Sequence, residues 1–236
     1  MIWKVSVRVM LALIAIAVVS GCDGCKFMLY MFGDEYKTVQ PQYKPGMEKK
    51  KLAVVVHAPH AVASDFPRLV DDVTAAVTAE FRRCVNEKAS GLKGVELVDP
   101  RDIKVYKNNN LDWSIADRTK MGKALGADYV LFVCVVDFST VVEGSGMLLF
   151  RGNLLADAKL YDVSLPKDKA MVWPKTTNES GSFTEVFPPY SPTADSDENT
   201  VRFMVINSFK TKLVRKFHKH KVRKDEDERP NPALAN

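Results

Sequence analysis

Two histidines are the side chains in this sequence best suited to chemistry. His57 and His60 flank Pro59 directly after the apolar run Leu52–Val56, and Asp65 is the nearest carboxylate. Imidazole nitrogens and carboxylate oxygens are ligands in catalytic zinc sites, and α/β sheets place ligands at the carboxyl ends of their strands. The His57–Asp65 loop is therefore an alternative candidate for a ligand-binding, metal-binding or hydrolytic site. We prefer the plainer interpretation, two polar loop residues, and expect no metal and no other cofactor.

The four cysteines allow several kinds of chemistry and establish none. Cys22 and Cys25 have the spacing of a redox or metal pair, but they lie on no strand–helix unit, so we interpret Cys25 as incidental. Cys84 falls on a predicted amphipathic helix and Cys134 in an apolar strand, and we expect both to be buried as small hydrophobic side chains. If Cys22 carries lipid, three thiols remain, and the pairing of Cys25, Cys84 and Cys134 stays open.

No catalytic motif accompanies these residues. Aspartates such as Asp99, Asp128 and Asp157 are scattered, and no spacing forces two carboxylates together for general acid–base catalysis. The sequence contains no nucleophile elbow, phosphate-binding loop or zinc-protease motif. The formal charge of +5 is too mild to indicate nucleic acid binding. We therefore expect a protein that is not an enzyme and binds no nucleic acid.

The first residues have the three-part build of a secretory signal peptide. Lys4 and Arg8 form a basic start, Val9–Val19 is an unbroken apolar run, and Ser20-Gly21-Cys22 closes it. A membrane-spanning helix needs about 20 apolar residues, so a plain transmembrane anchor is the less favoured alternative, with a cleaved signal and an incidental cysteine as another. We assign residues 1–21 to the signal peptide.

The close of this segment, Val19-Ser20-Gly21-Cys22, resembles the lipobox of bacterial lipoproteins. The resemblance implies cleavage between Gly21 and Cys22 and diacylation of the Cys22 thiol with fatty acids such as palmitate. The acyl chains would anchor the mature chain to the lipid bilayer of the cell envelope, with its domain in the periplasm. Asp23 resembles the signal that retains such proteins in the inner membrane of enteric bacteria, but the choice between inner and outer membrane stays open.

After the anchor, the hydrophobic pattern predicts a tether, one domain and a tail. Residues 22–51 lack sustained periodicity and form the tether, 52–222 form a single α/β domain, and 223–236 form a disordered charged tail. In the first part of the domain, strands alternate with helices. The predicted elements are a strand over 52–56, a helix over 66–85, a strand over 95–98, a helix from Asp112 or Ser114 to Leu125, and a strand over 129–136.

From Asp137 onward the pattern changes to antiparallel strands and a closing helix. Residues 154–161 alternate between apolar and polar, and Ala158–Val163 with Ala170–Trp173 predicts a hairpin. Residues 174–198 are interpreted as a loop. The last helix is capped by Asp197 and buries a stripe from Val201 to Phe217. The basic stretch 210–224, which includes His218 and His220, is interpreted as a solvated helix end, with contact to anionic lipid or polymer as the alternative.

This order of elements indicates an α/β fold with a mixed sheet, β-α-β-α-β followed by antiparallel strands and a C-terminal helix. It resembles the periplasmic α/β module shared by the TolB amino-terminal domain, the curli-secretion lipoprotein and the lipoprotein activator of a peptidoglycan synthase. The residues that carry the resemblance are Leu52–Val56, Gly126-Ala127-Asp128-Tyr129-Val130-Leu131, Ala158-Lys159-Leu160-Tyr161-Asp162-Val163 and Lys169-Ala170-Met171-Val172-Trp173. The turn departs from the group's pattern, with Pro166 and Lys167 where the group often has Thr-Gly.

An anchor, a flexible tether and a compact domain without a catalytic signature lead us to expect a non-enzymatic module that binds an envelope protein, as an accessory subunit of an assembly or transport complex. A homo-oligomer, including an export subunit, is a further alternative, and the sequence names no partner.

Overall fold

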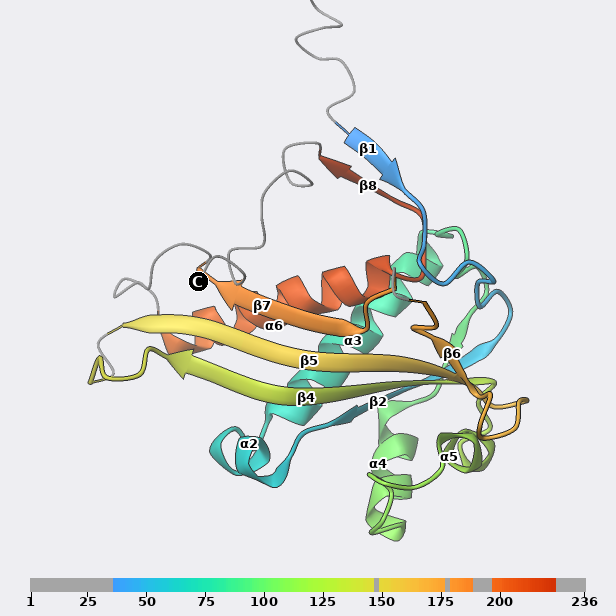
Figure 1. Ribbon diagram of the computed structural model, residues 1–236, viewed down its shortest axis with the longest axis horizontal. Helices are drawn as coiled ribbons and strands as arrows, with labels where there is room; N and C mark the ends of the chain where they lie inside the picture. The colour runs from blue at the N-terminus through green and yellow to red at the C-terminus, as the bar shows by residue number, and fades with distance from the viewer. Residues whose placement is uncertain (1–35, 147–148, 177–178, 189–196, 224–236) are drawn as a thin grey trace, which may run out of the picture. The chain divides into compact units, whose positions relative to one another are not determined.

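The computed structural model describes residues 36–146, 149–176, 179–188 and 197–223, and its main element is a six-stranded mixed sheet (Figure 1). The strands are β2 (Lys51–His57), β3 (Glu96–Leu97), β4 (Tyr129–Val141), β5 (Phe150–Asp162), β6 (Met171–Trp173) and β7 (Ser182–Phe187). Their order is β3-β2-β4-β5-β6, and β7 also pairs with β5. Strands β3, β2 and β4 are parallel, whereas β5, β6 and β7 pair antiparallel. The predicted α/β fold with a mixed sheet is confirmed.

The centre of the sheet is buried on both faces because helices cover each side. Helices α3 (Leu69–Asn86) and α6 (Glu198–Arg215) pack on the face that holds Leu52, Val54 and Val56. Residues of α4 (Pro100–Asn109) and α5 (Arg118–Ala124) pack on the other face, with Ala53 and Val55. This double coverage explains why the predicted central strands read as continuous apolar runs.

The helices begin at side-chain caps that the sequence partly indicates. The carboxylates of Asp99, Asp117 and Asp197 accept hydrogen bonds from backbone N–H groups in the first turns of α4, α5 and α6. The predicted cap at Asp197 is therefore confirmed. The helix predicted from Asp112 or Ser114 begins only at Arg118, and the His57–Asp65 loop contains a short helix, α2 (His60–Asp65).

Part of the predicted loop 174–198 is a strand, so that interpretation was wrong for residues 182–187. Strand β7 pairs with β5 from Gly152 to Asp157. The buried carboxylate of Glu185 lies 2.8 Å from the amine of Lys212 and accepts a hydrogen bond from Ser208, both on α6. The alternation of apolar and polar residues expected of a strand is interrupted by Glu185, which is charged but buried. Its partners lie more than twenty residues away, so the sequence does not indicate its burial.

Strand β4 extends beyond its parallel neighbour β2. Its pairing with β2 ends at Cys134, whereas its pairing with β5 continues to Val141. Two irregularities interrupt the register with β5, one between Val135 and Asp137 and one between Ser139 and Val141. Both lie in the part of β4 that β2 does not reach.

Both ends of the domain differ from the predicted boundaries. The side chains of Tyr43 and Met47 are buried in the core, so the part of the tether over 40–50 packs onto the domain. Helix α6 ends at Arg215, and His218 is buried rather than solvated. A separate small unit contains a two-stranded sheet of β1 (Tyr36–Val39) and β8 (His220–Arg223).

Several predicted segments lie outside the described residues. They are the signal peptide, Gly21, Cys22, Asp23, Cys25 and the tail from 224 onward. In the part of the chain that the structure describes, no helix is both long enough and apolar enough to cross a membrane.

Candidate functional site

The candidate site lies at the carboxyl end of β2, where this strand extends beyond its neighbour β3. Pairing between the two strands ends at Leu52 and Leu97, while β2 continues to His57. The chain leaves β2 toward α3 on one face of the sheet and leaves β3 toward α4 on the other face (Figure 1). Such a reversal opens a crevice that commonly binds ligands in α/β proteins. Here the crevice has a volume of about 440 Å³ and lies between α3 and α4.

The amine of Lys107 is the central polar group of this crevice. Its Nζ donates a hydrogen bond of 2.7 Å to the backbone carbonyl of Val56 and lies 4.3 Å from the ring centroid of Trp113. Burial lowers the pKa of Lys107 to about 8, and the charge of Asp71 opposes this shift only weakly. Among the described residues, no carboxylate forms an ion pair with Lys107. The crevice therefore contains a largely buried amine that lacks a counter-ion.

His57 lies beside this group, in a cluster of aromatic and cationic side chains. Its ring is 5.3 Å from that of Trp113 and 6.3 Å from that of Phe132, between ring centroids. Burial lowers the pKa of His57, and the positive charges of Lys107 and Arg118 lower it further. The imidazole is therefore mainly neutral at pH 7.

Arg118 holds the segment that carries Trp113. Its guanidinium group lies 3.8 Å from the ring centroid of Phe132. The same group donates hydrogen bonds to the carbonyl oxygens of Trp113, Ser114 and Ala116, at 2.9, 2.5 and 2.7 Å. One cation thus satisfies three backbone acceptors in the turn between α4 and α5, which positions Trp113 against Lys107.

The structure does not assemble the metal site considered for the His57–Asp65 loop. His60 and Asp65 are exposed at opposite ends of α2, while His57 contacts aromatic rings. Across the described ranges, no three His, Cys, Asp or Glu side chains lie close enough to hold a metal ion. The metal-binding candidate is therefore corrected: Pro59 and the start of α2 separate the residues that the sequence brings near one another.

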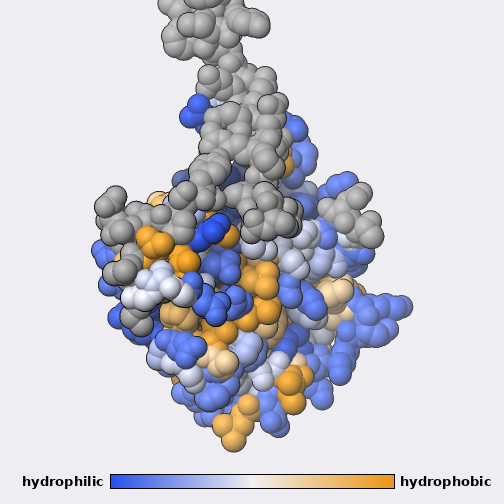
Figure 2. Space-filling view, turned by 60° about the vertical axis from the view of Figure 1, so that its left-hand side comes forward, coloured by the Kyte–Doolittle hydropathy of each residue, from blue (hydrophilic) through white to orange (hydrophobic). Residues whose placement is uncertain are grey.

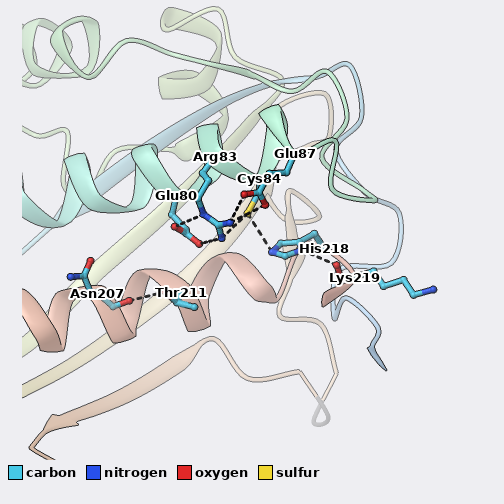
Figure 3. Close-up of polar contacts among 8 residues, drawn as sticks. All are labelled: Glu80, Arg83, Cys84, Glu87, Asn207, Thr211, His218 and Lys219. Carbon is cyan, nitrogen blue, oxygen red and sulfur yellow. Dashed lines mark hydrogen bonds and ion pairs between the residues drawn. The ribbon is translucent and has the colours of Figure 1, made fainter. Parts of the chain in front are cut away.

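A second polar cluster joins α3 to the segment after α6 (Figure 3). The sulfur of Cys84 lies 3.5 Å from Nε2 of His218, and Nδ1 of His218 lies 3.0 Å from the carbonyl oxygen of Lys219. Arg83 contacts the carboxylates of Glu80 and Glu87 at 2.6 and 2.7 Å. Sequence analysis missed this cluster because Cys84 and His218 are 134 residues apart.

The chemistry of this second cluster is structural. Only 1% of Cys84 is exposed, and burial raises the pKa of its thiol. A protonated, inaccessible thiol is a poor nucleophile. The expectation that Cys84 is buried is confirmed, whereas Cys134 is only partly buried; both are free thiols.

A third feature is the exposed apolar surface of the α4–α5 segment. We define the α4–α5 apolar surface as Val105, Leu111 and Ile115, whose exposed fractions are 58, 90 and 84%. Figure 2 shows apolar atoms at the lowest point of the view, the end of the molecule at which Figure 1 has the end of α4. Exposed apolar side chains that gather on a protein surface often mark a site of contact with another molecule.

No family model and no curated protein matches the chain. The solved structures to which the chain is similar include the following three, each at low identity. The lipoprotein GNA1162 from Neisseria meningitidis has a TM-score of 0.41 at 16% identity, with 70% of this chain and 98% of that chain covered. For the PelC dodecamer from Paraburkholderia phytofirmans the TM-score is 0.40 at 12% identity, with 78 and 98% covered.

The third structure is protein XCC0632 from Xanthomonas campestris, of the family DUF330. Its TM-score is 0.43 at 17% identity, with 75% of this chain and 85% of that chain covered. No conclusion about function follows from similarity at these TM-scores.

Proposed function

We propose that this chain is a cell-envelope lipoprotein, anchored by acylated Cys22, whose α/β domain binds a protein partner in the periplasm without catalysing a reaction. The proposal of an anchor is supported by the lipobox-like sequence Val19-Ser20-Gly21-Cys22. The α4–α5 apolar surface is the observation that carries the proposal of a protein partner.

The charges around this surface indicate the chemistry of the partner. Residues 101–123 contain six basic and three acidic side chains. Two of the basic side chains, Lys107 and Arg118, are engaged within the domain. The exposed remainder, Arg101, Lys104, Lys120 and Lys123, surrounds the apolar residues in sequence. We therefore expect a partner whose apolar patch is bordered by carboxylates, because complementary charge steers association.

The anchor is tested by intact-mass measurement of the protein purified from membranes. We expect a chain that begins at Cys22 and carries at least two acyl chains, and a Cys22→Ser variant that leaves the membrane fraction. An uncut, unacylated amino terminus would contradict the anchor but would leave the partner surface untouched.

The partner surface is tested by photo-crosslinking in intact cells. A crosslinking amino acid at Leu111 should give one defined protein adduct, and the same amino acid at Phe203, which is exposed on α6, should not. Replacing Lys104 and Lys120 together by Glu should abolish the adduct. Adducts formed only with lipid or with a second copy of the chain, or an adduct that survives the charge reversal, would refute the proposed partner.

A further inference from the structure

The crevice between α3 and α4 has an unbalanced charge. Among the described residues that line it, Asp71 is the one acidic side chain; it is paired with Lys104 at 3.6 Å, and both of these side chains are mostly exposed. Lys107, deeper in the crevice, has no such partner among the described residues. An amine removed from water without a counter-ion is costly to the folded state. An anion bound in the crevice would remove this cost.

The amine retains hydrogen-bonding capacity for such an anion. A lysine ammonium group has three N–H donors. The carbonyl of Val56 accepts one of them, and the ring face of Trp113 lies on another side. At least one donor is left beside the open space of the crevice, and a carboxylate at this position would form a charge-assisted hydrogen bond.

The crevice is of a size for a small organic molecule, and part of its wall is apolar, although Thr74, Arg101 and Asn108 also line it. Val70 and Ala75 on α3 face Ile103 on α4, with Trp113 beside them. The volume of about 440 Å³ lies within the range that small-molecule sites occupy. Inorganic anions such as phosphate have no apolar part to use these walls, whereas an organic acid does.

We propose that this crevice binds a small organic carboxylate, whose carboxylate group contacts the amine of Lys107 and whose apolar body packs against Trp113 and Ile103. None of the three residues of the α4–α5 apolar surface lines this crevice, although Arg101 and Lys104 of its basic border do. The crosslink at Leu111 and the benzoate titration therefore test the two proposals separately. The crevice also replaces the His57–Asp65 loop as the ligand-binding region of the domain.

The test uses benzoate as the carboxylate probe and benzamide as its uncharged counterpart. The full chain is labelled with 5-fluorotryptophan, and the Trp113 resonance is identified with a Trp113→Phe variant. We expect benzoate to shift the Trp113 resonance in a saturable manner, and benzamide to bind at least about tenfold more weakly because it lacks the charge. The buried Trp173 resonance should not move and reports an intact fold.

Two variants separate the role of the amine from the shape of the crevice. Lys107→Met should weaken benzoate binding by about tenfold or more, and Ala75→Phe should block the crevice while leaving the amine in place. Lys120→Met, which removes an exposed lysine of α5, should bind benzoate as the unmodified protein does. Equal binding of benzoate and benzamide, full binding by Lys107→Met or Ala75→Phe, or no saturable shift of Trp113 would each overturn the proposal.

Discussion

Lys107 supplies to Val56 the hydrogen-bond donor that a neighbouring strand would otherwise provide. Its Nζ lies 2.7 Å from the carbonyl oxygen of Val56, at a point where β3 has already ended and β2 continues. A side chain from α4 thus completes the edge of the central strand. The same placement buries a cationic amine, so the structure of the strand edge and the pKa of the amine are linked.

This link predicts a pH dependence of stability. The pKa of Lys107 is about 8 in the folded chain and 10.5 in the reference state, so between these values the unfolded chain binds more protons. Stability should therefore rise with pH through this window. We expect the free energy of unfolding of the unmodified protein, minus that of Lys107→Met, to increase from pH 8 to 10.5 in urea titrations. A flat difference would show that folding does not shift the pKa of the amine, and a falling difference would show that folding raises it; either result would contradict this prediction.

Replacing Gly122 of α5 by alanine is expected to destabilise the protein, although alanine is the better helix former. A Cβ atom at this position would lie 2.2 Å from Cγ2 of Val163 and 2.9 Å from Cγ2 of Val130. Alanine is favoured over glycine by about 1 kcal/mol in an exposed helix, but overpacking a core costs about 1–3 kcal/mol. We expect Gly122→Ala to lower the midpoint of urea unfolding, with Lys120→Ala on the same helix as the control. A raised midpoint would mean that α5 moves freely away from the sheet.

His218 should contribute to stability although it is a histidine in a basic segment. Its ring is buried against Cys84, and it lies in the segment that follows α6. His218→Ala removes this packing and the contact with the thiol, and we expect a loss of about 1–3 kcal/mol in the free energy of unfolding. His60→Ala is the matched control, because His60 is exposed and its loss should stay within about 0.5 kcal/mol. Equal effects of the two changes would place His218 in solvent.

The pair of Glu185 and Lys212 predicts non-additive mutational effects. Lys212→Met removes the ion pair of the buried Glu185 carboxylate and leaves it the hydroxyl of Ser208 and the charge of Lys216, and should cost about 1–3 kcal/mol. Because the cost arises from the carboxylate left behind, the double variant Glu185→Leu with Lys212→Met should recover part of it. A double-mutant cycle in urea measures the coupling directly. Additive effects would show that the two side chains do not interact.

The elements that sequence analysis predicted are those whose burial is visible locally. Strand β2 is apolar from Leu52 to Val56 and strand β4 from Tyr129 to Val136, and the stripe of α6 recurs at helical spacing. Helix α4 has no such apolar stripe, because Ile103 is its one buried residue. Strand β7 was missed because its polar position, Glu185, faces a partner on α6 rather than solvent.

The candidate site could not be predicted because its contacts join distant segments. Lys107 and Val56 are 51 residues apart, and neither position is unusual in the sequence. Conversely, residues that are close in sequence need not form a site. His57 and His60 are three residues apart, but His57 packs against aromatic rings and His60 is exposed. The amine can reach the carbonyl because β3 ends at Leu97, where β2 still continues toward His57, so within the described part of the chain no strand covers this edge of β2.

The irregular outer part of β4 has a consequence for how the protein avoids self-association. Among the residues that the structure describes, the backbone of this strand beyond Cys134 has a ladder partner on one side only, and a flat strand of that kind would be a template for aggregation. The two breaks in its register twist the ladder at that part of the strand. Because such breaks hinder edge-to-edge pairing, a deletion that restored a regular ladder there is expected to make the chain prone to fibre formation.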